Sequence, residues 1–208
     1  MEVNANIVKE LREKTGAGVM DCKKALSESK GDFEKAVAWL HEKGAAAAAK
    51  RAGRVATEGS VGSYIHAGGK LGVLVEINCE TDFAAKGDKF QTLVKEIAMQ
   101  IAAANPRCVR REELPTDVLE QEKQIYASQA AATGKPEAVI VKIVEGKLEK
   151  FLKEACLLEQ SWVRDPNRTI QELVGEYVGV IGEKIEVRRF VRFQLGEGIS
   201  KAEDGAAS

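Results

Sequence analysis

Three short apolar stripes with the spacing of an α-helix occupy the first 44 residues. Thr15-Gly16-Ala17-Gly18 separates the first stripe from the second, and Gly31 separates the second from the third. We expect Asp32 to cap the third helix and Gly44 to end it. The pattern predicts three helices that share one small core. The apolar residues are Val3, Ile7, Val8 and Leu11 in the first stripe; Val19, Cys22, Ala25 and Leu26 in the second; Phe33, Ala36, Val37 and Leu40 in the third.

The next segment has a different composition. Ala45 to Ala49 are all alanine, and Lys50, Arg51 and Arg54 follow. Alanine favours a helix but offers little surface to bury. We therefore expect a mobile helical connector over residues 46–58, whose basic side chains are either solvated or in contact with an acidic partner.

From Gly59 onward the apolar period changes to two. Strands are predicted for residues 61–66 and 71–79, joined by a turn at Ala67-Gly68-Gly69-Lys70. A last strand is predicted from about Lys184 to Leu195, and together the three form an antiparallel sheet. In the last strand Arg189 and Phe190 break the alternation, which indicates either a bulge or cover on both faces. The residues of that strand sharing one parity are Ile185, Val187, Val191, Phe193 and Leu195.

Four helical regions lie between the second strand and the last. They cover residues 90–101, 118–126, 139–152 and 170–181, with Gly146 a candidate break in the third and Gly182 the end of the fourth. The fold class is therefore α+β, with a small antiparallel sheet packed on helices. The expected organisation is a three-helix module at 1–45, the connector at 46–58, the core at 59–196 and a disordered tail at 197–208.

Composition narrows the class of protein. Charged residues make up 30% of the 208 and the formal net charge is -1, so no basic excess favours a nucleic-acid partner. Hydrophobic residues at 44% indicate a folded chain. No stretch approaches the roughly 18 apolar residues of a membrane helix. We expect no direct binding of nucleic acid or membrane.

The four cysteines fit no zinc or redox pattern. Their spacings differ widely, and each lies in or beside an apolar run, as reduced thiols in a core do: they are Cys22, Cys79, Cys108 and Cys156. Such usage suits a reducing compartment, and the first residues show no signal peptide. The sequence therefore predicts a cytoplasmic protein.

Several short motifs fail the test for cofactor or metal chemistry. Gly68-Gly69-Lys70 has the wrong glycine spacing for a phosphate loop, and Leu71 stands where Ser or Thr must bind magnesium. Gly16-Ala17-Gly18 follows no strand and lacks the third glycine of a dinucleotide loop. The two histidines, His41 and His66, have no partner at metal-ligand spacing. We expect no catalytic residue, no metal site and no cofactor.

Two features do point to an interaction. Met20 projects away from the stripe of Val19, Cys22 and Leu26, beside a glycine-rich turn, which would make it an adaptable apolar contact or an isolated surface residue. Thr81-Asp82-Phe83 follows a strand and precedes a helix, where functional side chains often lie. The alternative is that Phe83 enters the core and Asp82 caps the next helix.

At these two places the sequence resembles the bacterial elongation factor Ts family. The run Val8–Leu26 resembles its N-terminal signature, and Asn78–Lys86 resembles its second signature. Val19 and Ala84 depart from the pattern, since many members carry Met and Val there. The resemblance extends from about Ile7 to Gly196. Further agreement lies at Gly134-Lys135-Pro136, Leu157–Gln160 and Arg188–Phe193.

The resemblance implies a guanine-nucleotide exchange factor of translation elongation, which is not an enzyme. Its partner would be elongation factor Tu, GDP-bound or nucleotide-free, and its first helices would be similar to ubiquitin-associated domains. By the same resemblance, Arg12, Val19 and Met20 would hold the GTPase domain. Thr81, Asp82, Phe83 and Ala84 would disturb the region of its bound magnesium. The chain resembles the short members, in which two subunits can pair as a homodimer.

Three other functions compete with this one. A ubiquitin-binding module would use only residues 1–44 and leave Asn78–Lys86 unexplained. An RNA-binding protein would use Lys50, Arg51 and Arg54. A thiol enzyme would use Cys79, with His66 approaching it across the predicted hairpin.

Overall fold

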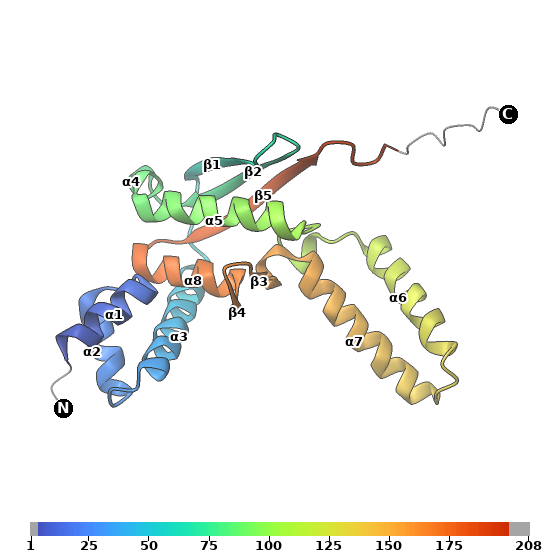
Figure 1. Ribbon diagram of the computed structural model, residues 1–208, viewed down its shortest axis with the longest axis horizontal. Coiled ribbons are helices and arrows are strands. Elements are labelled where there is room, and N and C mark those ends of the chain that lie inside the picture. The colour runs from blue at the N-terminus through green and yellow to red at the C-terminus, as the bar shows by residue number, and fades with distance from the viewer. Residues whose placement is uncertain (1–3, 200–208) are drawn as a thin grey trace.

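The structure is a computed structural model that describes residues 4–199 (Figure 1). It confirms the α+β class, with eight α-helices and a three-stranded antiparallel sheet in the described residues. Most of the expected tail at 197–208, and Val3 of the first stripe, lie outside those residues. None of the helices within residues 4–199 is long and apolar enough to cross a membrane.

The three predicted N-terminal helices are present as α1 (Ala5–Thr15), α2 (Val19–Glu28) and α3 (Phe33–Arg51). The Asp32 carboxylate caps α3 by accepting a bond from the amide of Lys35 at 3.1 Å, as expected. Residues of all three stripes meet in a core that is separate from the main one. Val19, of the second stripe, is exposed at the surface. That core consists of Val8, Leu11, Ala17, Cys22, Ala25, Leu26, Ala36, Val37 and Leu40.

The prediction that Gly44 ends the third helix is wrong. Helix α3 continues through the alanine run to Arg51, and Ala47 and Ala48 pack against the main core. The reason is close packing on α8 (Ile170–Ile181): a Cβ added at Gly44 would lie 3.0 Å from the carbonyl oxygen of Gly175. Small side chains let the two helices approach, so residues 46–51 of the expected connector continue α3.

The sheet has the order β1 (Glu58–Ile65), β2 (Leu71–Cys79), β5 (Ile185–Gln194), with every pair antiparallel. The predicted turn joins β1 to β2, and the amide of Gly69 donates to the carbonyl of His66 within it. Helix α5 (Asp88–Ala104) lies along one face of the sheet (Figure 1).

The broken alternation in the last strand is explained by a β-bulge in β5. Ile77 pairs with Val187, but Glu76 pairs with Arg189, so Arg188 is the extra residue. The bulge is one of the two alternatives that the broken alternation indicated, and beyond it the residues that share one parity point to the opposite face of the sheet. Ile185 and Val187 are buried, whereas Val191, Phe193 and Leu195 are exposed. Arg188 and Arg189 both bond to Glu76, which lowers the pKa of that carboxyl.

The main core lies between the sheet, α5 and α8. All five stripe residues of α5 are buried, and each large apolar side chain removed from water contributes about 1.5–3 kcal/mol. Gly182 ends α8 in the left-handed conformation, as predicted, with φ of 84°. The buried α5 stripe consists of Phe90, Leu93, Val94, Ile97 and Ile101.

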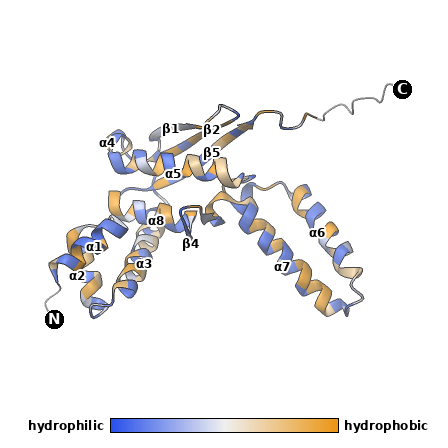
Figure 2. Cartoon of the chain, viewed as in Figure 1, coloured by the Kyte–Doolittle hydropathy of each residue, from blue (hydrophilic) through white to orange (hydrophobic). Residues whose placement is uncertain are grey.

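Helices α6 (Thr116–Ala131) and α7 (Glu137–Ala155) form a hairpin that projects away from the sheet (Figure 1). Gly146 does not interrupt α7. Figure 2 shows hydrophobic residues along α7 as far as its outer end, yet within α6 and α7 only Ala130, Val144 and Ala155 are buried. The hairpin is held by its root and by its own pairing, with little core of its own.

Sequence reasoning did not find the shortest elements. These are α4 (Asp82–Lys86), the 3-10 turns η1 (Arg111–Glu113) and η2 (Leu157–Glu159), and the small hairpin of β3 (Ser161–Trp162) and β4 (Asp165–Thr169). They are too short for hydrophobic periodicity to reveal.

Candidate partner-binding site

The segment Thr81-Asp82-Phe83 forms the junction between β2 and α4. Thr81, and not Asp82, is the N-cap: its hydroxyl oxygen accepts a bond from the amide of Ala84 at 3.2 Å. The Cys79 thiol donates to the carbonyl of Thr81 at 3.2 Å, beneath the junction. The strand end and the helix start are therefore fixed by local bonds.

A carboxylate from the far end of the sequence holds the same junction. Glu183 accepts bonds from the amides of Glu80 and Thr81, at 3.1 and 3.0 Å, and from the Thr81 hydroxyl at 2.7 Å. Glu80 in turn accepts from the amide of Lys184 at 2.6 Å and from Arg54. These bonds lower the pKa of Glu80, chiefly through the Lys184 amide. Residues about a hundred positions apart thus brace each other.

Phe83 projects from this braced junction into solvent and is 85% exposed. The alternative in which it enters the core is therefore wrong. Asp82 is also exposed and pairs with Lys86 at 2.7 Å, one helical turn away. The bond from Lys86 lowers the pKa of Asp82, so the carboxylate is ionised at neutral pH. Ala84 is buried, so it seats α4 against the core and leaves Asp82 and Phe83 as the outward groups.

The second predicted contact lies at the turn before α2. Met20 is 74% exposed, as its position off the apolar stripe predicted. Its neighbour Val19 and, in α1, Arg12 are exposed as well. Gly16 ends α1 with φ of 67°, a conformation that favours glycine. The Thr15 hydroxyl donates to the carbonyl of Leu11 at 2.7 Å and stabilises the same turn.

A lysine joins the two regions. The Nζ atom of Lys89, in the first turn of α5, donates to the carbonyl of Gly16 at 3.0 Å. That carbonyl is at the C-terminal end of α1, where a cation is favoured by the helix dipole. Sequence reasoning missed Lys89, Glu183 and Glu80, because nothing in their local spacing marks contacts across 73 to 104 residues.

The geometry is unfavourable for a thiol enzyme. In the β1–β2 ladder Cys79 pairs with Glu58, whereas Ile65, next to His66, pairs with Gly72 at the opposite end. Seven strand residues separate the two positions, roughly 23 Å. Burial, with the charge of Glu183, raises the pKa of Cys79 to about 11, and His66 bonds instead to the hydroxyl of Tyr64.

The basic residues of the alanine-rich segment are partly engaged within the chain. Arg51 donates to the carbonyl of Gly182 at 3.0 Å, and Arg54 pairs with Glu80. This arrangement gives little support to an RNA-binding stripe. Among residues 4–199, no group of three or more His, Cys, Asp or Glu side chains is placed to hold a metal ion.

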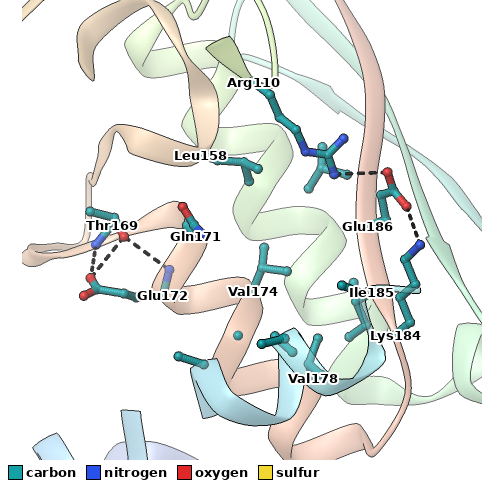
Figure 3. A pocket seen from close by; sticks show the side chains of 16 residues that line it. Arg110, Leu158, Thr169, Gln171, Glu172, Val174, Val178, Lys184, Ile185 and Glu186 are labelled. Carbon is teal, nitrogen blue, oxygen red and sulfur yellow. Dashed lines mark hydrogen bonds and ion pairs between the residues drawn. The ribbon is translucent and has the colours of Figure 1, made fainter. Parts of the chain in front are cut away.

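A groove of about 600 Å³ lies between α3, α8 and β5 (Figure 3). Its charged side chains are paired: Arg110 and Lys184 both bond to Glu186 at 3.0 Å, and Glu172 closes the capping box with Thr169. A small-molecule site normally offers converging polar groups that are free to bind. The groove therefore does not compete with the loop as the functional site.

Comparison with known proteins supports the family resemblance that the two signature regions indicated. The family model described as Elongation factor TS matches residues 1–197. The chain is 59% identical over 207 residues to "Elongation factor Ts" of Desulforamulus reducens, which covers 100% of this chain and 95% of the relative. It is 60% identical over 208 residues to "Elongation factor Ts" of Geobacter sulfurreducens, covering 100% and 96%. The chain therefore belongs to the elongation factor Ts family of translation elongation factors.

Proposed function

We propose that this chain releases GDP from elongation factor Tu by inserting the Asp82–Phe83 loop near the magnesium and phosphate site of that GTPase, so that GTP can bind. Membership of the family implies nucleotide exchange on elongation factor Tu. No covalent bond is made or broken in such an exchange, so the function is not enzymatic. The proposal places the chain in the cytoplasm, with the translation machinery.

The observation that carries the proposal is the exposure of Phe83 on a braced loop. Burying an aromatic ring at an interface releases about 1.5–3 kcal/mol relative to leaving it in water. Because Glu183 and Thr81 already fix the loop, little conformational entropy is lost on binding. A large, pre-positioned apolar group is suited to act as a wedge in a partner.

Asp82 supplies the polar part of the proposed mechanism. Magnesium requires near-octahedral oxygen ligands and links protein groups to phosphates, so a displaced ligand or water weakens nucleotide binding. The exposed, ionised carboxylate of Asp82 would compete for such a water or for the cation. The coupling is reciprocal: a tenfold loss of GDP affinity requires about 1.4 kcal/mol, and GDP weakens binding of the factor equally.

The N-terminal module has a different proposed role. Arg12, Val19 and Met20 would contact the GTPase domain whether or not nucleotide is bound. Contacts that are the same in both states set affinity but cannot shift the equilibrium between them. The module would therefore hold the partner while the Asp82–Phe83 loop discriminates between its states.

We also propose that two copies of the chain pair through the outer face of the sheet. The bulge at Arg188 turns several apolar side chains to that face, away from α5, and they are exposed in the single chain. Two sheets can bury such faces against each other about 10 Å apart. Phe193→Asp should then give a monomer by light scattering, and a wild-type monomer at micromolar concentration would contradict the idea. The exposed apolar residues of the outer face are Val61, Ile65, Leu74, Val191 and Phe193.

The central experiment measures release of fluorescent GDP from purified elongation factor Tu. Phe83→Ala should slow the stimulated release about tenfold, corresponding to roughly 1.4 kcal/mol at the barrier. Its melting temperature should equal that of the wild type, because the ring is exposed. Val163→Ala removes another exposed apolar side chain and should leave release unchanged.

Excess EDTA should restore much of the rate to Phe83→Ala, since it removes magnesium by another route. A well-folded double variant, Asp82→Ala with Phe83→Ala, that retains normal exchange would refute the proposed mechanism. Loss of exchange that follows only the unfolded fraction would refute it as well.

A further inference from the structure

The root of the α6–α7 hairpin contains two cysteines that face each other. The segment after α5 lies beside the end of α7, with the amide of Arg107 donating to the carbonyl of Ala155 at 2.8 Å. The amide of Leu157 donates to the carbonyl of Cys108 at 3.0 Å. Cys108 and Cys156 are paired here as a parallel β-bridge. The backbone therefore holds the two residues side by side.

The two thiols are within reach of each other. Their Sγ atoms lie 3.6 Å apart and both cysteines are free. Bridged neighbours on adjacent strands lie about 4.8 Å apart, within the Cα separation of roughly 4.4–6.8 Å that a disulfide tolerates. Small side-chain rotations, without backbone movement, would bring the sulfurs to bonding distance.

Charged contacts keep the root in this geometry. Arg111 donates to both oxygens of Glu149, at 2.9 and 2.6 Å, and also to Glu159. The guanidinium of Arg107 lies 5.4 Å from the centre of the Phe151 ring. These contacts join the segment before α6 to α7 and η2, so the two thiols remain near each other while reduced.

We propose that Cys108 and Cys156 are a redox-modification site, at which a small peroxide converts the two thiols into an intramolecular disulfide that closes the root of the hairpin. Cys108 is 7% exposed and Cys156 is 0% exposed, so Cys108 meets the oxidant first. The Cys108 thiol loses its proton and the thiolate attacks one oxygen of hydrogen peroxide; the O–O bond breaks, and the released hydroxide takes up that proton, which leaves a sulfenic acid and one water. The Cys156 sulfur then attacks the Cys108 sulfur, the S–O bond breaks, and the hydroxide leaves as a second water with the proton of the Cys156 thiol.

The balance is two thiols and one hydrogen peroxide giving one disulfide and two waters; the sulfurs lose two electrons to the peroxide. Burial raises the pKa of Cys108, and it raises that of Cys156 to about 12. Few thiolates are present at neutral pH, so the reaction is slow and needs a small oxidant that can enter.

The other two cysteines provide an internal comparison. The Cys22 thiol donates to the carbonyl of Ala17, and the Cys79 thiol donates to the carbonyl of Thr81. In the described residues each is buried in a different core cluster, Cys22 in that of the module and Cys79 in the main core. Oxidation of either cannot be resolved by a neighbouring thiol.

The test is treatment of the native full-length chain with hydrogen peroxide, followed by peptide mass mapping. We expect loss of two hydrogens, a Cys108–Cys156 cross-linked peptide, and a melting temperature raised by about 5–10 °C that dithiothreitol reverses. The rise follows because the cross-link spans 48 residues and restricts the unfolded chain.

Matched variants separate the pair from the other thiols. The Cys22→Ala, Cys79→Ala double variant should form the cross-link as the wild type does, and Cys108→Ala should not form it. Sulfinic acid at Cys108 without a cross-link, disulfides between chains, or a cross-link formed only in denaturant would each overturn the proposal. The test is independent of exchange activity.

Discussion

The Asp82–Phe83 loop and the Gly16–Met20 turn both present an apolar side chain to solvent, but they are held in different ways. The loop is braced by Glu183, from the segment between α8 and β5, and by Glu80, through bonds that join distant parts of the core. The turn is held mainly by its own helix caps and by Lys89. Under the function proposed above, the braced loop would act as the wedge in the partner and the turn would contribute to affinity alone.

Removing the brace should have the largest effect. Glu183→Ala leaves the amides of Glu80 and Thr81 without their acceptor, so we expect a loss of about 1–3 kcal/mol in unfolding free energy. Stimulated GDP release should fall about tenfold, since Phe83 is no longer pre-positioned. Chemical denaturation and fluorescent-GDP release on the same preparation measure both quantities. Glu183→Gln keeps an acceptor oxygen, so its stability and its release rate should lie between those of the wild type and those of Glu183→Ala. Full activity in Glu183→Ala would contradict the difference drawn here between loop and turn.

A charge at the turn should affect affinity and leave the exchange step intact. Met20→Asp should raise the dissociation constant for nucleotide-free elongation factor Tu about tenfold, or roughly 1.4 kcal/mol. Release at saturating factor should stay near the wild-type rate, and the helical spectrum should be unchanged because Met20 is exposed. Titration by calorimetry gives the affinity. Met20→Leu serves as the apolar control, and equal binding by the Asp and Leu variants would argue against a contact here.

Breaking the link between the two regions should have a smaller effect. Lys89→Met loses the bond to the Gly16 carbonyl but keeps the apolar stem. A cation at an exposed helix C-terminus contributes about 0.3–1 kcal/mol. If the whole of this energy serves to hold the turn in its binding position, the affinity for elongation factor Tu should fall about two- to fivefold. The loss should diminish at high salt. A salt-independent loss would point instead to altered packing of α5.

The smallest effect concerns the ionisation of Asp82. The bond from Lys86 lowers the pKa of Asp82 in the folded chain. The ionised carboxylate therefore adds to the free energy of unfolding at a pH above the unfolded pKa of about 3.9. That stability is lost as the pH falls through the lowered folded pKa. Lys86→Met should raise the Asp82 pKa, measured by carbon NMR of the carboxyl group. GDP release at pH 7 should not change, because Asp82 is ionised in both proteins.

Hydrophobic periodicity predicted most of the fold. The caps at Asp32 and Gly182, the β1–β2 turn and the long helices follow from local side-chain preferences. The errors arose where packing overrides local preference. Gly44 would end a free helix, but here it permits contact with Gly175. In β5 the sequence located the irregularity near Arg189 and left two explanations open. Only the pairing with β2 identifies it as a bulge with Arg188 as the extra residue.

In the candidate site, too, local properties could be predicted from the sequence and long-range contacts could not. The sequence alone determined that Met20 lies off its helical stripe and that Asp82 and Phe83 follow a strand, because these are properties of neighbouring residues. Only the tertiary structure decided that Phe83 points into solvent and that Glu183 and Lys89 hold the two regions. Those contacts join residues 73 to 103 positions apart. Their partners are chosen by how the sheet and helices pack, a choice that no local pattern of polar and apolar residues encodes.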